Sequence, residues 1–346
     1  MMLGIDAWVR PRDGLTSVFD RLSQGSAAIA YLGLSVTAQR DGFRPRLHVA
    51  IEHMTGRAHR AINAGVGGVG SVSMAFLMDQ LVVAHRPALC FIECTTGDID
   101  GRTPVDDAPR AIEGILRKLA AIDCAACILH LYQREQSRQT SHPILAGYER
   151  IADHYGVPSI DAGHRIEDDI TEGRADADVL FRDVVHTTPD GADVVAHLIV
   201  DALAFIRTQA GPAEGRLGER TRCTDGAFDR GFVVDARPED CNSTPATGRF
   251  RLTCPFVDVD ASNAIHFRRE DLALAGFAFI AGPTTGVVRV STASSDTDYQ
   301  TWDRWCVYDR LSTVVFPAAI PAGMPVTIRP IAPSRLQLVS FFCIPR

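Results

Sequence analysis

The sequence lacks the features that mark several classes of protein. It contains no apolar run of the about 18 residues that a bilayer-spanning helix needs. Its first residues, "MMLGIDAWVRPRDG", show no basic stretch followed by a long apolar one, so we expect no signal peptide. The net charge is −7, which argues against a nucleic-acid partner because phosphate binding needs a dense basic surface. We therefore expect neither a membrane nor a nucleic acid as a partner.

The pattern of a metal site is also missing from the sequence. There is no His-Glu-x-x-His, and the histidines show no ligand spacing, so we expect no metal and no cofactor. One short basic cluster, "RDGFRPR", stands at residues 40–46. We interpret it as the solvated start of a helix rather than as a binding site.

The cysteines argue against a disulfide-stabilised extracellular protein. There are nine, an odd number, and most stand inside apolar runs such as "ALCFIECTT" and "DCAACILHL". This usage is typical of reduced, buried thiols in a cytoplasmic protein. Cys124 and Cys127 form a C-x-x-C, but no second ligand pair accompanies them. Two packed core thiols are therefore favoured over a metal or redox site.

The length of 346 residues, 46% of them hydrophobic, predicts two domains, because a single core seldom grows that large. Up to about residue 210, short apolar runs alternate with patterns of helical spacing, which predicts a parallel sheet flanked by helices. The expected strands are 27–35, 60–68, 88–96, 125–133 and 157–163, and the expected helices are 43–56, 71–87, 106–122, 144–156 and 190–208. We assign residues 1–210 to this α/β domain.

The pattern changes after residue 210. The stretch "QAGPAEGRLGERTRCTDG" is rich in glycine and charge, and it predicts a linker over residues 211–225. Beyond it come short β-rich runs separated by turn signals, such as "GVVRVSTAS" and "MPVTIRPI". They predict that residues 226–346 form an antiparallel sandwich or jelly roll, an accessory domain of a different class.

Candidate chemistry is concentrated where the predicted parallel strands end. Sites in such sheets form at the carboxyl ends of the strands. Three strand-end segments are "GLSVTAQ", "NAGVGGVGS" and "CTTGDID", and a fourth segment, "DVVH", precedes the last helix. We expect all four to meet at one edge of the sheet.

Two of these segments have more than one interpretation. Ser35 can be a nucleophile if a base reaches it, or it can simply cap the helix that follows. The glycine-rich turn at 63–71 lets backbone amides approach a ligand closely. It also resembles a nucleotide-phosphate loop, although a dinucleotide fingerprint is expected after the first strand of a unit.

Asp183 and His186 form the sharpest pair. At this i, i+3 spacing the carboxylate can hold one ring nitrogen, which leaves the other free to take a proton from a hydroxyl. The chain order Ser, Asp, His also occurs in α/β-hydrolases, but those place the serine in G-x-S-x-G. Here the residue two after Ser35 is Thr37, so that motif is absent.

Taken together, these residues resemble the SGNH (GDSL-like) hydrolase family over about residues 27–207. Three blocks match in the family's order: Gly33-Leu34-Ser35, then Asn63, Gly65 and Gly68, then Asp183, His186, Pro189 and Gly191. The resemblance implies a flavodoxin-like three-layer αβα sandwich. It also implies a catalytic triad of Ser35, Asp183 and His186, with the amides of Ser35 and Gly68 binding the oxyanion.

The family's remaining block departs from the pattern. Members usually end it in Asn-Asp, and the asparagine donates to the oxyanion, whereas here Gly97 precedes Asp98. Removing one oxyanion donor typically lowers the rate by about 10²–10³. A hydroxyl from Thr95 or Thr96 is a candidate substitute, so Thr96 and Gly97 join the candidate oxyanion residues.

The resemblance implies an O-acyl, in particular O-acetyl, ester hydrolase that acts on an acylated carbohydrate. An O-acetyltransferase that modifies a surface polysaccharide or its precursor would use the same triad, because water and sugar hydroxyls compete for one acyl-enzyme. A non-catalytic glycan-binding protein is the third hypothesis. In each case the β-rich second domain is expected to help hold a glycan.

Overall fold

The computed structural model describes residues 4–134, 142–209, 217–226, 228–237, 245–249 and 253–346. The chain forms two compact units, Met1–Asp229 and Arg230–Arg346. Each unit has its own sheet system and its own buried apolar cluster.

The first unit is built on one six-stranded sheet with the order β1-β6-β5-β4-β2-β3. Five of its strands run parallel, and only the short β1 is antiparallel, beside β6. Counted from β2, the parallel strands have the order 2-1-3-4-5 of flavodoxin-like sheets, which confirms the predicted fold class. The strands are β1 (Val9–Arg10), β2 (Ala28–Gly33), β3 (Arg60–Gly65), β4 (Leu89–Glu93), β5 (Ala125–His130) and β6 (Ser159–Asp161).

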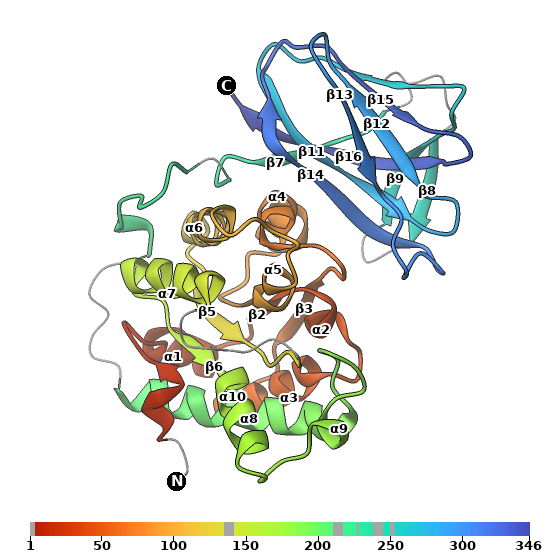
Figure 1. Cartoon of the computed structure of the whole chain (residues 1–346). Helices are drawn as coiled ribbons and strands as arrows, with labels where there is room; N and C mark the ends of the chain where they lie inside the picture. The colour runs from red at the N-terminus through yellow and green to blue at the C-terminus, as the bar shows by residue number, and fades with distance from the viewer. Residues whose placement is uncertain (1–3, 135–141, 210–216, 227, 238–244, 250–252) are drawn as a thin grey trace. The chain divides into compact units, whose positions relative to one another are not determined.

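Helices cover both faces of this sheet and complete three layers (Figure 1). One face carries α4 (Ser71–Leu81), α5 (Thr95–Ile99), α6 (Asp107–Ala120) and α7 (Pro143–Tyr155). The other carries α1 (Thr16–Gln24), α3 (Phe43–Thr55), α8 (Ala162–Thr171) and α10 (Pro189–Gln209). The short helices are α2 (Ser35–Ala38) and α9 (Ala177–Leu180), with single 3₁₀ turns at Ile5–Ala7, Val83–His85 and Leu217–Glu219.

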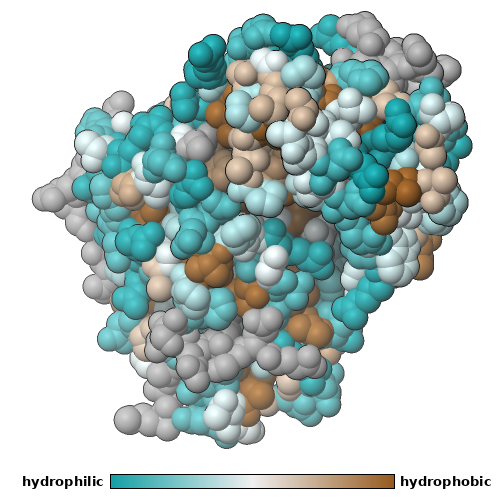
Figure 2. All heavy atoms as spheres, turned by 45° about the horizontal axis from the view of Figure 1, so that its top comes forward, coloured by the Kyte–Doolittle hydropathy of each residue, from teal (hydrophilic) through white to brown (hydrophobic). Residues whose placement is uncertain are grey.

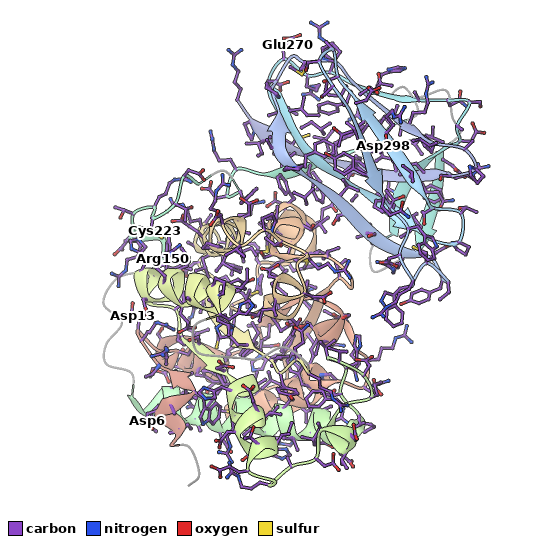
Figure 3. The ribbon with its side chains drawn as sticks, viewed as in Figure 1. Asp6, Asp13, Arg150, Cys223, Glu270 and Asp298 are labelled. Atoms are coloured by element: carbon purple, nitrogen blue, oxygen red, sulfur yellow. The ribbon has the colours of Figure 1, made fainter. Side chains whose placement is uncertain are left out.

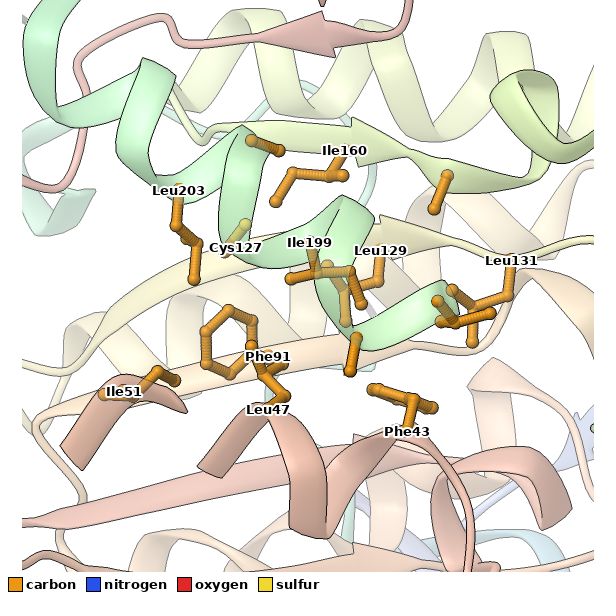
Figure 4. Close-up of a cluster of buried hydrophobic side chains, with 14 of the residues drawn as sticks. Phe43, Leu47, Ile51, Phe91, Cys127, Leu129, Leu131, Ile160, Ile199 and Leu203 are labelled. Carbon is orange, nitrogen blue, oxygen red and sulfur yellow. The ribbon is translucent and has the colours of Figure 1, made fainter. Parts of the chain in front are cut away.

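Hydrophobic spacing explains why α3 lies against the sheet. Phe43, Leu47 and Ile51 recur every fourth residue, so they share one face of the helix, and all three are buried. Figure 4 shows this row facing Phe91 of β4, with side chains of α10 such as Ile199 beside it. The core between sheet and helices therefore follows directly from the sequence period.

Apart from the 3₁₀ turns and the short α2 and α5, four helices and strands of the first unit have no counterpart among the predicted ones. The two-residue β1 and the single turn of α9 are too short to show a period. Helices α1 and α8 bury only three residues each, so polar side chains dominate their sequence pattern. Their positions are set by the sheet edge and helix layer that they cover.

The second unit consists of two antiparallel sheets, as predicted. One has the order β10-β15-β12-β13, and the other has the order β14-β11-β16-β9-β8, with β7 also paired to β16. Both contribute to a single buried cluster that contains Val288, Ile328, Phe277 and Phe341. The strands are β7 (Phe232–Asp235), β8 (Pro245–Arg249), β9 (Thr253–Val259), β10 (Ile265–Phe267), β11 (Leu272–Ala281), β12 (Val287–Ser291), β13 (Asp296–Gln300), β14 (Arg310–Ile320), β15 (Val326–Pro330) and β16 (Leu336–Pro345).

Within the described part of the chain, no helix has the length and apolar character to cross a bilayer. The face drawn in Figure 2 shows apolar side chains in small groups separated by hydrophilic ones.

The stretch that resembles a linker is anchored to the first unit. Residues 217–226, with Phe228 and Asp229, form a segment that we call the strap. The buried carboxylate of Glu113 on α6 accepts hydrogen bonds from the amide nitrogens of Cys223 (2.7 Å) and Thr224 (2.8 Å) and from the Tyr155 hydroxyl (2.6 Å). The compact first unit accordingly extends to Asp229.

Two further contacts hold the strap. Gly114 of α6 lets it approach closely, since a Cβ there would lie 2.9 Å from the Asp229 nitrogen. The guanidinium of Arg110 lies over the Phe228 ring and pairs with Asp225. Cys223, exposed on the strap, is labelled in Figure 3 together with Arg150 of α7, whose charge acts on its thiol.

The strap predicts how stability depends on Glu113. Burial alone would raise the pKa of this carboxyl, but its hydrogen bonds to Thr224, Tyr155 and the Cys223 amide lower it to about 2. Glu113→Gln should reduce the free energy of unfolding at pH 7 by about 1–3 kcal/mol, because a buried donor loses its acceptor. Urea denaturation of the full-length protein measures this difference.

The same carboxyl should contribute to acid sensitivity. Its pKa in the folded protein lies below the value of about 4.3 of an unfolded chain, so its stabilising contribution is complete above about pH 4.5. That contribution is lost as the pH falls toward 2. Wild type and Glu113→Gln should therefore converge in stability at low pH, and a constant difference down to pH 2 would contradict this account.

Candidate active site

Three of the predicted strand-end segments lie side by side. Gly33, the last residue of β2, pairs with Gly65 at the end of β3 on one side. On the other side it pairs with Glu93 at the end of β4. The segments that follow these residues therefore start from one edge of the sheet, as the parallel topology predicts.

The glycines at these strand ends allow helix α2 to approach the sheet. A Cβ on Gly65 would lie 2.6 Å from the Ala38 nitrogen, and a Cβ on Gly33 would lie 2.5 Å from the Glu93 carbonyl oxygen and would also meet Thr37. Only a residue without a side chain permits this contact. The close fit places Ser35, the first residue of α2, directly above the strand ends.

Ser35 lies against the glycine-rich turn. A Cβ on Gly67 would be 3.3 Å from the Ser35 Cβ, so the two residues are in contact. Gly68, the candidate oxyanion residue, follows with a φ of +78°, a left-handed conformation that favours glycine. The side-chain oxygen of Asn63 accepts from the Gly65 amide (3.2 Å) and stabilises the start of the turn.

Gly97 lies between the first and second blocks. A Cβ built on it would be 2.7 Å from the Val69 carbonyl oxygen and would also meet the Leu34 side chain. With this backbone there is no room for the asparagine that the resembled family carries here. The departure from the pattern of the resembled family thus coincides with a close contact of α5 with Leu34 and Val69.

The threonine hydroxyls that were candidate substitutes for the asparagine are engaged elsewhere. The Thr95 hydroxyl is hydrogen-bonded to Nδ1 of His130 (2.9 Å), and the Thr96 hydroxyl donates to the Glu93 carboxylate (2.7 Å). Both threonines are buried. Because both hydroxyls are already hydrogen-bonded, neither threonine side chain is available as an oxyanion donor, and α5 can offer only backbone amides.

Two buried carboxylates, Glu93 just before α5 and Asp98 within it, are not among the candidate residues. Glu93 accepts hydrogen bonds from the Leu34 amide (3.4 Å), from the Thr37 hydroxyl (3.1 Å) and from Thr96. Burial raises the pKa of Glu93 to about 7, and these hydrogen bonds limit the rise. The signal in the sequence was a single charged residue inside the apolar run "ALCFIECTT".

Asp98 acts in a similar way on the glycine-rich turn. Its carboxylate accepts from the Ser71 amide (2.9 Å), where α4 begins and the turn ends, and from the Tyr148 hydroxyl (2.6 Å). Burial raises the pKa of Asp98, while the hydrogen bonds from Ser71 and Tyr148 oppose the rise.

Asp183 and His186 form the predicted pair. His186 Nδ1 lies 2.8 Å from Asp183 Oδ2 and 3.0 Å from Oδ1, and the backbone amides of Val185 (3.0 Å) and His186 (2.7 Å) also donate to Oδ1. Partial burial would raise the pKa of Asp183, but these hydrogen bonds lower it. An ionised Asp183 holds a proton on Nδ1, which leaves Nε2 as the basic nitrogen.

A hydrogen bond connects helix α2, which begins at Ser35, to the loop that contains His186. Helix α2 begins at Ser35 and is capped by Gln39, whose side-chain nitrogen donates to the Thr187 carbonyl oxygen (2.9 Å). Thr187 directly follows His186, and its carbonyl also accepts from Arg182 Nε (2.9 Å). The fourth predicted segment is therefore joined to the first.

The basic cluster at 40–46 is a helix start, as predicted, because α3 begins within it at Phe43. Arg44 donates to the Thr37 carbonyl oxygen (3.1 Å), and Arg46 pairs with Asp193 of α10. These arginines hold the first unit together rather than forming a basic surface.

The comparisons with known proteins match the fold of the whole chain. One solved structure, a two-domain esterase (CEX) active on acetylated mannans and co-crystallized with mannopentaose, has a TM-score of 0.79 at 16% identity, covering 100% of this chain and 99% of that one. A second structure of the esterase has a TM-score of 0.77 at 16% identity, covering 99% and 98%. The chain has the fold of a two-domain esterase. This two-domain esterase fold confirms the predicted architecture of both units.

Sequence comparison adds no further relative. No protein-family model matches the chain, and no curated protein matches it. In the part of the chain that the structure describes, no group of three or more His, Cys, Asp or Glu side chains is arranged to hold a metal ion.

The packing around Gly97 predicts that the family's asparagine is not tolerated. Gly97→Asn should lower the free energy of unfolding by about 1–3 kcal/mol, the usual effect of forcing atoms into a filled space. Gly25→Ala is the matched control, because nothing lies within 4 Å of a Cβ at that position. Urea denaturation compares the two variants, and a Gly97→Asn protein as stable as wild type would show that α5 has room for the side chain.

Proposed function

We propose that the protein is a serine-dependent hydrolase that removes acyl groups, acetyl in particular, from an acylated carbohydrate. The observation that carries the proposal is the hydrogen bond from Gln39 to Thr187, because it joins the helix that begins at Ser35 to the loop that holds the Asp183–His186 pair. The whole-chain likeness to an esterase active on acetylated mannans supports hydrolysis and a glycan substrate.

The proposed reaction follows the chemistry of a serine–histidine–aspartate triad. His186 Nε2 takes the proton of the Ser35 hydroxyl, and the Ser35 oxygen attacks the ester carbonyl carbon. The tetrahedral intermediate collapses, and the sugar oxygen leaves with the proton from His186. Water, deprotonated by the same imidazole, then hydrolyses the acyl-enzyme and regenerates Ser35.

We infer that the oxyanion is bound by backbone amides alone. The proposed donors are Ser35 and Gly68, with Gly97 as the third because it lies against Leu34 and Val69. Thr96 is excluded from this set, since its hydroxyl and its amide both face Glu93. The Gly97 amide would then replace the asparagine side chain, since the loss of one donor without replacement lowers turnover by about 10²–10³.

A nucleophile at Ser35 predicts the behaviour of two variants. Ser35→Ala and His186→Ala should each lower hydrolysis of p-nitrophenyl acetate by at least about 10³-fold, because members of a triad act as a unit. Ser23→Ala, which removes a hydroxyl bonded only to a helical carbonyl, should retain full activity. Intact-mass detection of an acyl adduct that is lost in Ser35→Ala would locate the intermediate, and unchanged turnover in that variant would refute the proposal.

We further propose that the second unit contacts the glycan through the loop between β13 and β14. Three aromatic side chains of this loop are strongly exposed: Trp302 (49%), Trp305 (46%) and Tyr308 (59%). Exposed aromatic groups of this size mark interaction surfaces, and flat rings with a polar edge suit the faces of sugars. The ion pair between Asp303 and Arg310 (2.5 Å) supports the base of the loop.

This role predicts a separation between small and large substrates. Trp302→Ala and Trp305→Ala should weaken binding of mannopentaose and slow deacetylation of acetylated mannan, while p-nitrophenyl acetate turnover stays at the wild-type level. Val307→Ala is the matched control, because Val307 is 74% exposed on the same loop but carries no ring. Calorimetric affinities for mannopentaose that are equal in all variants would remove the loop from the glycan site.

We infer a reducing, cytoplasmic location from the thiols. Seven cysteines whose side chains the structure describes are free, and every one of these except Cys223 is buried. Cys124 and Cys127 are among them, and burial raises the pKa of both thiols far above the usual value, as expected for packed core residues.

A further inference from the structure

A buried carboxylate binds the turn that carries the proposed nucleophile and has no part in the triad. Glu93 is the last residue of β4 and is only 1% exposed. Burial raises its pKa to about 7, so keeping it ionised in this position is energetically unfavourable. An apolar residue at the end of the strand would avoid the cost of removing a carboxylate from water, so Glu93 is expected to have a specific role.

The hydrogen bonds of Glu93 reach both sides of Ser35. One carboxylate oxygen, Oε2, accepts from the Leu34 amide and from the Thr37 hydroxyl, which belong to the residue before Ser35 and to the residue two after it. The other, Oε1, accepts from the Thr96 hydroxyl on α5. The Thr96 amide also donates to the carboxylate.

These contacts join the two segments whose amides form the proposed oxyanion site. On one side is the turn that carries the Ser35 amide, and on the other is α5, where Gly97 follows Thr96. Gly97 also touches Leu34 directly. The Glu93 carboxylate therefore links the two segments, because it accepts hydrogen bonds from the Ser35 turn and from α5.

We propose that Glu93 is a positioning residue that aligns the Ser35 turn with α5 and so sets the geometry of the oxyanion site. This inference rests on the proposed function, because it assigns Glu93 a task in the same reaction. Glu93 does not touch the reacting atoms and acts only through Leu34, Thr37 and Thr96.

The donors around Glu93 favour a carboxylate over the amide of a glutamine. Two of its partners, the Leu34 and Thr96 amides, are backbone N–H groups that only donate. A glutamine has the same shape but replaces one acceptor oxygen by a donor NH₂ group. Replacing Oε2 sets the Leu34 amide against another donor, which removes that link to the Ser35 turn. Replacing Oε1 removes the acceptor of the Thr96 hydroxyl on α5.

The test compares Glu93→Gln with Glu113→Gln. Both variants replace a buried carboxylate by its isosteric amide, but Glu113 lies on α6, where it binds the strap, and is outside the proposed site. We expect Glu93→Gln to lower kcat for p-nitrophenyl acetate by about 10–100-fold with KM changed less than about threefold, since small misplacements of catalytic groups have effects of this size. Glu113→Gln should lose stability while retaining the wild-type kcat.

A second readout reports on Ser35 itself. The rate of Ser35 labelling by a fluorophosphonate, followed by intact mass, should fall in Glu93→Gln in parallel with kcat and stay unchanged in Glu113→Gln. If Glu93→Gln does not fold, Thr37→Val decides the question, because it removes one link to the same turn and keeps the carboxylate. Thr37→Val should then label several-fold more slowly than wild type.

The outcomes separate this inference from the proposed function. A folded Glu93→Gln or Thr37→Val protein with wild-type kcat and labelling rate, beside an inactive Ser35→Ala, would overturn the role of Glu93 and leave the triad intact. An equal loss of kcat in Glu93→Gln and Glu113→Gln would also overturn it, since the effect would then follow stability. Full turnover in Ser35→Ala would overturn the proposed function and this inference with it.

Discussion

The proposed site depends on the hydrogen bond between the Gln39 side chain and the Thr187 carbonyl oxygen. Ser35 and His186 stand about 150 residues apart, and each belongs to a short segment at the rim of the sheet. The Thr187 carbonyl oxygen, next to His186, accepts from both Gln39 and Arg182, so the His186 loop is held by the end of helix α2. A serine and a histidine act together only when such contacts fix their separation.

A second level of support comes from α5. Two carboxylates lie at or beside this short helix: Glu93, two residues before it, binds the turn around Ser35, and Asp98 within it binds the amide of Ser71 where the glycine-rich turn ends. Gly97 between them contacts both turns. The block around Gly97, which departs from the pattern of the resembled family, thus contacts the two segments beside it. Its backbone leaves no space for an asparagine side chain at Gly97.

Much of the fold and part of the site can be predicted from the sequence, for identifiable reasons. The alternation of apolar runs and helical patterns predicts the parallel sheet, and the row Phe43, Leu47 and Ile51 shows which face of α3 is buried. The pair Asp183 and His186 is visible because the two residues are close in the chain. Gln39 and Glu93 show no such signal, since their partners are distant in sequence and their roles exist only once the segments meet. The strap is similar, because its contact with Glu113 joins residues about 110 positions apart.

The sequence by itself determined the fold class of each unit, the segments that follow the parallel strands and the local pairing of His186 with Asp183. Hydrophobic periodicity and short residue spacings show these features, because both act within one segment of the chain. The tertiary structure alone decided that the strap belongs to the first unit, that Gly97 leaves no space for a side chain and that Thr95 and Thr96 turn their hydroxyls inward. Those outcomes depend on distances between segments that are remote in the chain. Such distances are set by close packing of the whole unit, which no local pattern encodes.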